Sequence, residues 1–132
     1  MFRLLFKKKK IKIKKINKEF LKNKELAKEL VRNKLEYWTG YYKEKHNINF
    51  EYNRVAVRNQ KTRWGSCSSR GNLNFNYRLA LIDEELVDYV IIHELCHLIE
   101  LNHGQNFWSL VELGCPDYKM KMQTLKNIRF SK

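Results

Sequence analysis

Apolar residues recur every three or four positions over residues 17–46, and this spacing predicts a long helix. The positions between them hold mainly Lys, Glu, Arg and Asn. The apolar positions are Ala27, Leu30, Val31, Leu35, Trp38 and Tyr42. They fall on one face of a helix, so we expect that face to pack against the rest of the domain.

Three segments after this helix have the patterns of short strands. RVAVRN (residues 54–59) alternates between apolar and polar positions, and NLNFNYRLA (72–80) alternates over nearly its whole length. Between them, TRWGSCSSRGN (62–72) carries turn residues between extended flanks. Three antiparallel strands are the simplest assembly of these segments.

The most apolar part of the chain, LVDYVIIHELCHLIEL, lies in a helix predicted over residues 84–101. A helix that is apolar on nearly all sides sits in the middle of a domain. A shorter helix is predicted over residues 105–113, where Phe107 and Trp108 are expected to pack it against the core. A final basic helix is predicted over residues 118–128. Together the elements predict an α+β fold.

The length and the charge divide the chain into two parts. Its 132 residues suit one domain, assigned to residues 17–132, preceded by a basic arm of residues 1–16. Residues 7–15 hold seven lysines in nine positions, and the arm is either a phosphate-binding segment or a solvated tail. The net charge of +13 suits a nucleic acid or another anionic surface. A coding bias toward Lys, Asn and Ile would give the same charge without such a partner.

The cysteines and the apolar runs indicate the compartment. The three cysteines are an odd number at spacings that imply no disulfide framework, which favours a reducing environment. The N-terminus has its apolar residues before its lysines, the reverse of a secretory signal. No uncharged apolar run approaches the roughly 18 residues of a membrane span. We therefore expect a soluble, cytoplasmic protein without a membrane partner.

The segment HELCH, within the apolar helix, predicts a metal site. His93 and His97 are four residues apart, so on a helix they differ by about 40° of rotation and about 6 Å of rise. Both imidazole rings can therefore reach one ion, and such pairs suit Zn²⁺. Glu94 lies about 100° from His93 around the axis, too far to be an equal ligand. It can still take a proton from a metal-bound water, which is the work of a general base.

His103 is the candidate for a third ligand, which leaves a fourth position for water. In a continuous helix it would lie about 9 Å beyond His97. The helix is therefore expected to end near Leu101, and the chain to fold back. Asn102 tolerates a left-handed helix end, and Gly104 frees the backbone after the ligand.

Other polar residues near the motif have lesser predicted roles. Glu100 is expected to accept a hydrogen bond from a ligand imidazole. Cys96 is expected to be a small buried residue. As a fourth ligand, Cys96 or Cys67 would make the site closed and structural. His46 is expected to be an exposed loop residue.

The ordered motifs resemble those of a known family. RWGSCSS, NLNFNYRLAL, VDYVIIHELCHLIELNHGQNFW and CPDY, between residues 63 and 118, look like the YgjP-like zinc metallopeptidases. The resemblance implies that His93, His97 and His103 bind zinc and that Glu94 is the catalytic acid and base. It also implies a minimal zincin fold, with an N-terminal helix, a small sheet, an active-site helix and C-terminal helices. The family is similar in turn to the SprT-like and Wss-type proteases, which cleave proteins crosslinked to DNA.

The predicted function is hydrolysis of peptide bonds in a protein or peptide substrate by a water that zinc polarises and Glu94 deprotonates. An extended substrate is expected to join the edge of the strand at residues 72–80. Tyr118 and Arg63 are the two candidates for stabilising the oxyanion.

Two other functions fit part of the sequence. The spacing His-x3-His-x5-His also occurs in the bacterial endoribonuclease of ribosomal RNA maturation. That family, however, does not place an acidic residue directly after the first histidine, as Glu94 is placed here. A zinc-stabilised, non-catalytic nucleic-acid-binding module would need a closed site or an inert Glu94.

Overall fold

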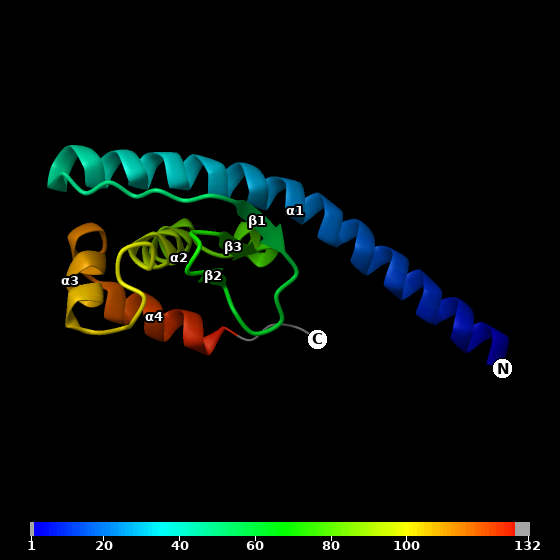
Figure 1. Cartoon of the computed structure of the whole chain (residues 1–132). Coiled ribbons are helices and arrows are strands. Elements are labelled where there is room, and N and C mark those ends of the chain that lie inside the picture. Colours follow the sequence, from blue (N-terminus) through cyan, green and yellow to red (C-terminus); the bar gives the residue numbers. More distant parts are fainter. Residues whose placement is uncertain (1, 129–132) are drawn as a thin grey trace.

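The predicted α+β class is confirmed by the computed structural model, which describes the backbone of residues 2–128 and the side chains of residues 20–128. The chain forms one long helix, a small sheet and three further helices (Figure 1). The elements in order are α1 (Phe2–His46), β1 (Val55–Arg58), β2 (Gly65–Cys67), β3 (Leu73–Asn76), the 3₁₀ helix η1 (Tyr77–Leu81), α2 (Glu84–Cys96), α3 (Gln105–Gly114) and α4 (Tyr118–Asn127).

Helix α1 is longer than its apolar pattern predicts. It begins at Phe2 rather than near residue 17, so the lysine-rich segment continues the helix. Residues 2–39 contain neither Gly nor Pro, and nothing in the sequence interrupts the helix there. Figure 1 shows the N-terminal half of α1 projecting beyond the other elements. The division into an arm of residues 1–16 and a domain of residues 17–132 stays a prediction.

The sheet is mixed, so the prediction of three antiparallel strands was wrong. Its order is β1-β3-β2. β2 and β3 form an antiparallel hairpin, whereas β1 runs parallel to β3 on its other side. Alternation shows which face of a strand is buried but does not name its neighbour, and this is why pairing in chain order failed. β3 is thus the central strand, and β2 is an edge strand.

β3 ends four residues earlier than predicted because Asn76 redirects the chain. Its side chain is fully buried, and its Oδ1 accepts a hydrogen bond (3.0 Å) from the backbone N–H of Arg78, which starts η1. Its Nδ2 donates to the carbonyls of Gln60 and Arg63, at 2.9 Å each. One buried amide therefore ends the strand and holds the loop between β1 and β2.

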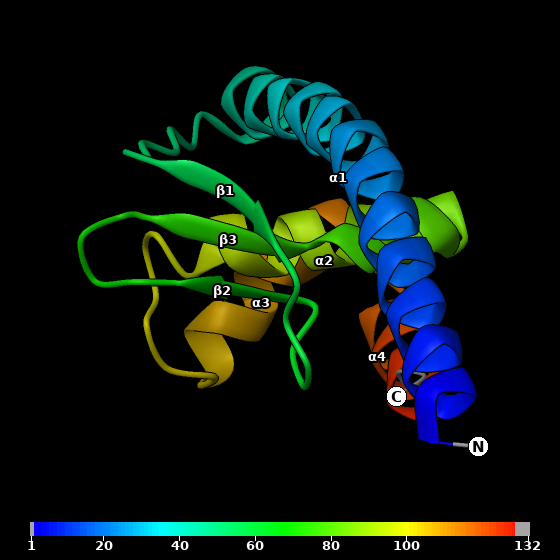
Figure 2. The ribbon, with the colours of Figure 1, turned by 90° about the vertical axis from the view of Figure 1, so that its right-hand side faces the viewer.

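Helix α2 is the central helix, as its apolar sequence predicts. Val87, Ile91, Ile92 and Leu95 are 0% exposed, and the helix contacts α1, β2, α3 and α4. Figure 2 shows the sheet in front of α2. In the described part of the chain, none of the helices combines the length and the apolar character needed to cross a bilayer.

Candidate metal centre

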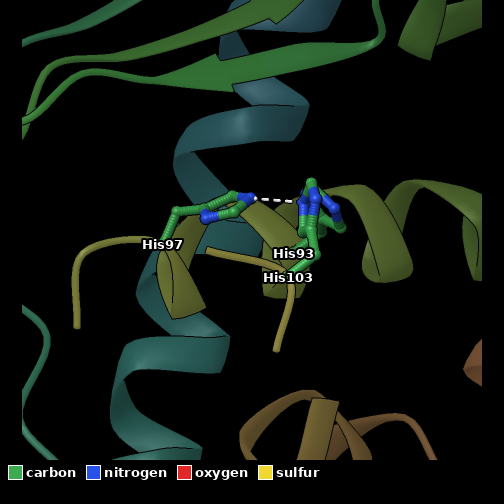
Figure 3. A group of neighbouring side chains, drawn as sticks. All are labelled: His93, His97 and His103. Carbon is green, nitrogen blue, oxygen red and sulfur yellow. Dashed lines mark hydrogen bonds between the residues drawn. The ribbon is translucent and has the colours of Figure 1, made fainter. Parts of the chain in front are cut away.

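Three histidine rings meet at the end of α2 (Figure 3). His93 and His97 lie on one side of the helix, and His103 comes from the loop that follows. One ring nitrogen from each histidine lies within 4.8 Å of the others. The structure therefore brings together the three residues that the sequence predicts as ligands.

The chain returns to the site by ending α2 at Cys96, about a turn before the predicted end near Leu101. Tight turns follow, in which the N–H of Leu98 donates to the carbonyl of Leu95 and that of Glu100 to the carbonyl of Cys96. The left-handed conformation predicted for Asn102 was wrong. Apart from glycines, only Asn47 has a positive φ among residues 2–128, so Asn102 is not left-handed. Gly104 is extended, with φ −86° and ψ −174°, and precedes α3.

Hydrogen bonds orient two of the rings. Nδ1 of His97 lies 3.0 Å from the backbone carbonyl of Glu100, and Nδ1 of His93 lies 3.0 Å from Oε2 of Glu94. A carbonyl and an ionised carboxylate only accept, so each Nδ1 donates the hydrogen bond, and Nε2 is the nitrogen of each ring that could bind a metal ion. Glu100 thus supports a predicted ligand as expected, but through its backbone carbonyl rather than its carboxylate.

The arrangement of nitrogens fits a metal ion. Nε2 of His97 lies 2.9 Å from Nε2 of His103. Burial lowers the pKa of both rings, and the nearby His93 lowers them further, so both rings are neutral at pH 7. Two ligand nitrogens in a tetrahedral zinc site lie about 3.3 Å apart. A cation between the rings would satisfy the lone pair of His97, which otherwise needs a proton from His103.

Glu94 lies under the sheet beside this cluster. It is 5% exposed, and the edge strand β2 passes over it at Gly65. Burial, and after it the charge of Glu94, raises the pKa of the Cys67 thiol to about 11. Neither Cys67 nor Cys96 belongs to the group of metal-binding atoms. The buried carboxylate of Glu94 thus contacts the histidine cluster directly, with Oε2 3.0 Å from Nδ1 of His93.

Two aromatic residues of α3 contact the histidine rings of the cluster, and the sequence interpretation missed these contacts. Phe107, fully buried, contacts all three histidines, with ring centroids 5.1 Å from His93, 4.4 Å from His97 and 4.9 Å from His103. Trp108 stacks on His103 at 5.7 Å. The available signal was their position four and five residues after His103, at the start of the next helix. These rings form the wall behind the cluster.

The remaining candidates divide between the site and the core. Arg63 lines the cleft beside the metal centre. Tyr118 instead stacks on Trp108, at 4.8 Å, and is not among the lining residues. His46 was predicted to be an exposed loop residue, which was wrong: it ends α1, its ring packs on Tyr41 and Tyr42, and its Nε2 is buried without a hydrogen-bond partner.

Comparison with known proteins agrees with this geometry. No curated protein matches the chain. The solved structure of the metallopeptidase zymogen of Pyrococcus abyssi abylysin matches with a TM-score of 0.59 and 24% identity, over 76% of this chain and 99% of that one. The metallopeptidase zymogen of Methanocaldococcus jannaschii jannalysin matches with a TM-score of 0.50 and 27% identity, over 75% and 96%. These likenesses confirm the predicted minimal zincin fold. The family model of the YgjP-like metallopeptidase domain matches residues 4–128, and the chain therefore belongs to this family of peptidases.

Proposed function

We propose that the chain is a zinc-dependent peptidase in which His93, His97 and His103 hold the ion and Glu94 is the general base. The observation that carries the proposal is the cluster of three imidazoles, with one nitrogen from each within 4.8 Å of the others and a buried carboxylate beside them. Imidazole ligands with one open position are typical of catalytic zinc sites. Membership of a metallopeptidase family argues against the endoribonuclease and the non-catalytic module.

Glu94 carries the proton transfers in this mechanism. A zinc ion held by the three rings would polarise the peptide carbonyl and make the attacking water more acidic. Oε2 of Glu94 accepts a hydrogen bond from His93 Nδ1, and we assign Oε1 to the water. Glu94 takes the proton as the water oxygen adds to the carbonyl carbon. It then donates the proton to the amine as the C–N bond breaks.

The edge strand β2 is the proposed binding strand for an extended substrate. β3 pairs with one edge of β2, and Gly65, Ser66 and Cys67 line the cleft. A peptide can add to such an edge by backbone hydrogen bonds. The sequence-based choice of residues 72–80 for this role was wrong, because β3 has a neighbour on both sides.

Casein cleavage by the zinc-loaded chain tests this proposal, with Glu94→Gln as the inactivating variant. We expect kcat to fall by about a hundredfold or more while zinc still binds. Glu100→Gln is the matched control, because it keeps the backbone carbonyl that accepts from His97. Equal activity of Glu94→Gln and the wild type would refute the role of Glu94.

We also propose nucleic acid as a partner that brings protein substrates to the enzyme. The support is the net charge of +13 and the seven lysines of residues 7–15. Single-stranded DNA should then raise casein cleavage at low salt, and the increase should vanish at high salt. Cleavage that is indifferent to DNA under both conditions would contradict this partner.

A further inference from the structure

The cleft beside the metal centre has an apolar compartment and two cationic groups. It has a volume of about 770 Å³ and contains His93, Glu94, His97 and His103 in its lining. Residues 62–67, and residues of α4 together with Ile128, also line it. The composition of this lining determines which side chains of a bound peptide the cleft can accept.

The apolar compartment begins within one helical turn of the metal centre. Val90 precedes His93 by three residues, which is about 4.5 Å along α2 on a neighbouring position of the same face. Leu125 of α4 also lines the cleft, and the side chains of Val90 and Leu125 are buried, at 3% and 6% exposed. Met122 and Ile128 line it as well and are half-buried. A substrate side chain next to the scissile bond would therefore contact apolar residues, of which Val90 and Leu125 are buried and Met122 and Ile128 are partly accessible to solvent.

The charges in the cleft are unbalanced. Among the described side chains, the charged ones that line it, apart from the histidines, are Arg63, Lys126 and Glu94. Arg63 and Lys126 are both exposed, and neither has an ion-pair partner among the described side chains. The loop that carries Arg63 is held by the hydrogen bond from Asn76 Nδ2 to its carbonyl. Since Glu94 is committed to the proton transfers, two cations remain to meet carboxylates of a substrate.

We propose that the preferred substrate is a peptide segment with a large apolar residue next to the scissile bond and acidic residues flanking it. The inference rests on the proposed peptidase function and names its substrate class. Burial of the apolar side chain against Val90 and Leu125 supplies binding free energy. Arg63 and Lys126 attract acidic segments and disfavour lysine-rich ones.

A peptide library, cleaved by the zinc-loaded full chain and analysed by mass spectrometry, tests the preference. Lys126→Glu should lower kcat/KM for acidic peptides relative to neutral ones by roughly tenfold at low salt. Met122→Ala should shift the preference toward larger apolar residues. The chain supplies matched controls on the same helix: Lys119→Glu and Met120→Ala, at exposed positions outside the cleft, should leave both preferences unchanged.

The possible failures are distinguishable. If the wild type and Glu94→Gln both cleave no peptide, the proposed function is overturned and this inference falls with it. If the wild type cleaves but shows no enrichment of apolar and acidic residues, the substrate class is wrong while the peptidase stands. If the wild type shows the enrichment of apolar and acidic residues, and Lys126→Glu and Met122→Ala show the same enrichment, the proposed role of α4 in substrate selection is overturned.

Discussion

Gly65 lies so close to Glu94 that a Cβ at this position would crowd the side chain of Glu94. A Cβ built on Gly65 would lie 3.0 Å from Cγ of Glu94 and 3.1 Å from its Oε2. It would also lie 3.2 Å from the backbone carbonyl of Asn74, on the neighbouring strand. Strand β2 therefore contacts the proposed general base at a glycine, and glycine is the one residue type whose lack of a Cβ leaves room for the Glu94 side chain.

Gly65→Ala should lower kcat while leaving zinc affinity nearly unchanged. The methyl group must displace the carboxylate or the strand, and a misplaced base loses roughly tenfold to a hundredfold in rate. The ligand rings are not among the nearest atoms to this position, so zinc should still bind. Kinetics of casein cleavage and a zinc-chelator competition would measure both effects.

Gly104→Ala is the control for this variant. Gly104 directly follows the ligand His103, yet a Cβ there would meet nothing within 4 Å. The Gly104→Ala variant should therefore retain the kcat of the wild type. An unchanged kcat in Gly65→Ala would show that the carboxylate does not need its present position under β2.

Phe107 is expected to set the zinc affinity through its contacts with all three ligand rings. Phe107→Ala removes that support, and loss of such support weakens metal binding by about tenfold to a hundredfold. The cavity also costs about 3–5 kcal/mol of stability, so Phe107→Leu, which fills most of the volume, is a second variant with a smaller expected loss. Zinc affinity is measured by chelator competition, and folding of the metal-free chain by circular dichroism.

Val111→Ala separates metal support from general packing. Val111 lies one turn after Phe107 in α3 and is also fully buried, but as an aliphatic residue it cannot stack on the histidine rings. Its truncation should lower stability and spare zinc affinity. If Phe107→Leu and Val111→Ala weakened zinc binding equally, the aromatic wall would have no specific role.

The local parts of the fold and site were predictable because they follow from spacing along the chain. The four-residue step from His93 to His97 puts both rings on one side of any helix. The apolar sequence around them also predicts the central position of α2. Both features depend on short-range geometry, and the structure agrees with them.

Features set by distant contacts were not predictable in the same way. Residues 98–101 contain no Gly or Pro, so the sequence gives no local stop for α2 at Cys96. Alternation could not reveal that β1 would pair with β3 in parallel. Phe107 has the sequence pattern of an ordinary core residue, and only the return of the chain after α2 places it behind the ligand rings.

Replacing the seven lysines of residues 7–15 by Gln in the full chain should abolish the effect of DNA without changing casein cleavage in its absence. The described lining of the cleft begins at Thr62 and contains the proposed catalytic residues, so the change is directed at the basic segment rather than at that lining. Charge neutralisation also removes the counterion release that makes DNA binding salt-dependent. Replacement by Arg keeps the charge and should keep the effect. A loss of basal cleavage in the Gln variant would contradict the division between arm and domain.

Cys67 reports on the charge of Glu94. Only the thiolate reacts readily with iodoacetamide, and a pKa of about 11 leaves roughly one thiol in a thousand ionised at pH 8. Alkylation of Cys67 in the metal-free chain should therefore accelerate until the pH nears 11. Glu94→Gln removes the negative charge that helps to raise this pKa, so its Cys67 should react faster at pH 8, while Glu100→Gln should match the wild type. Mass spectrometry of the modified peptide gives the rates. Identical rates for Glu94→Gln and the wild type would mean that the carboxylate does not lie near this thiol.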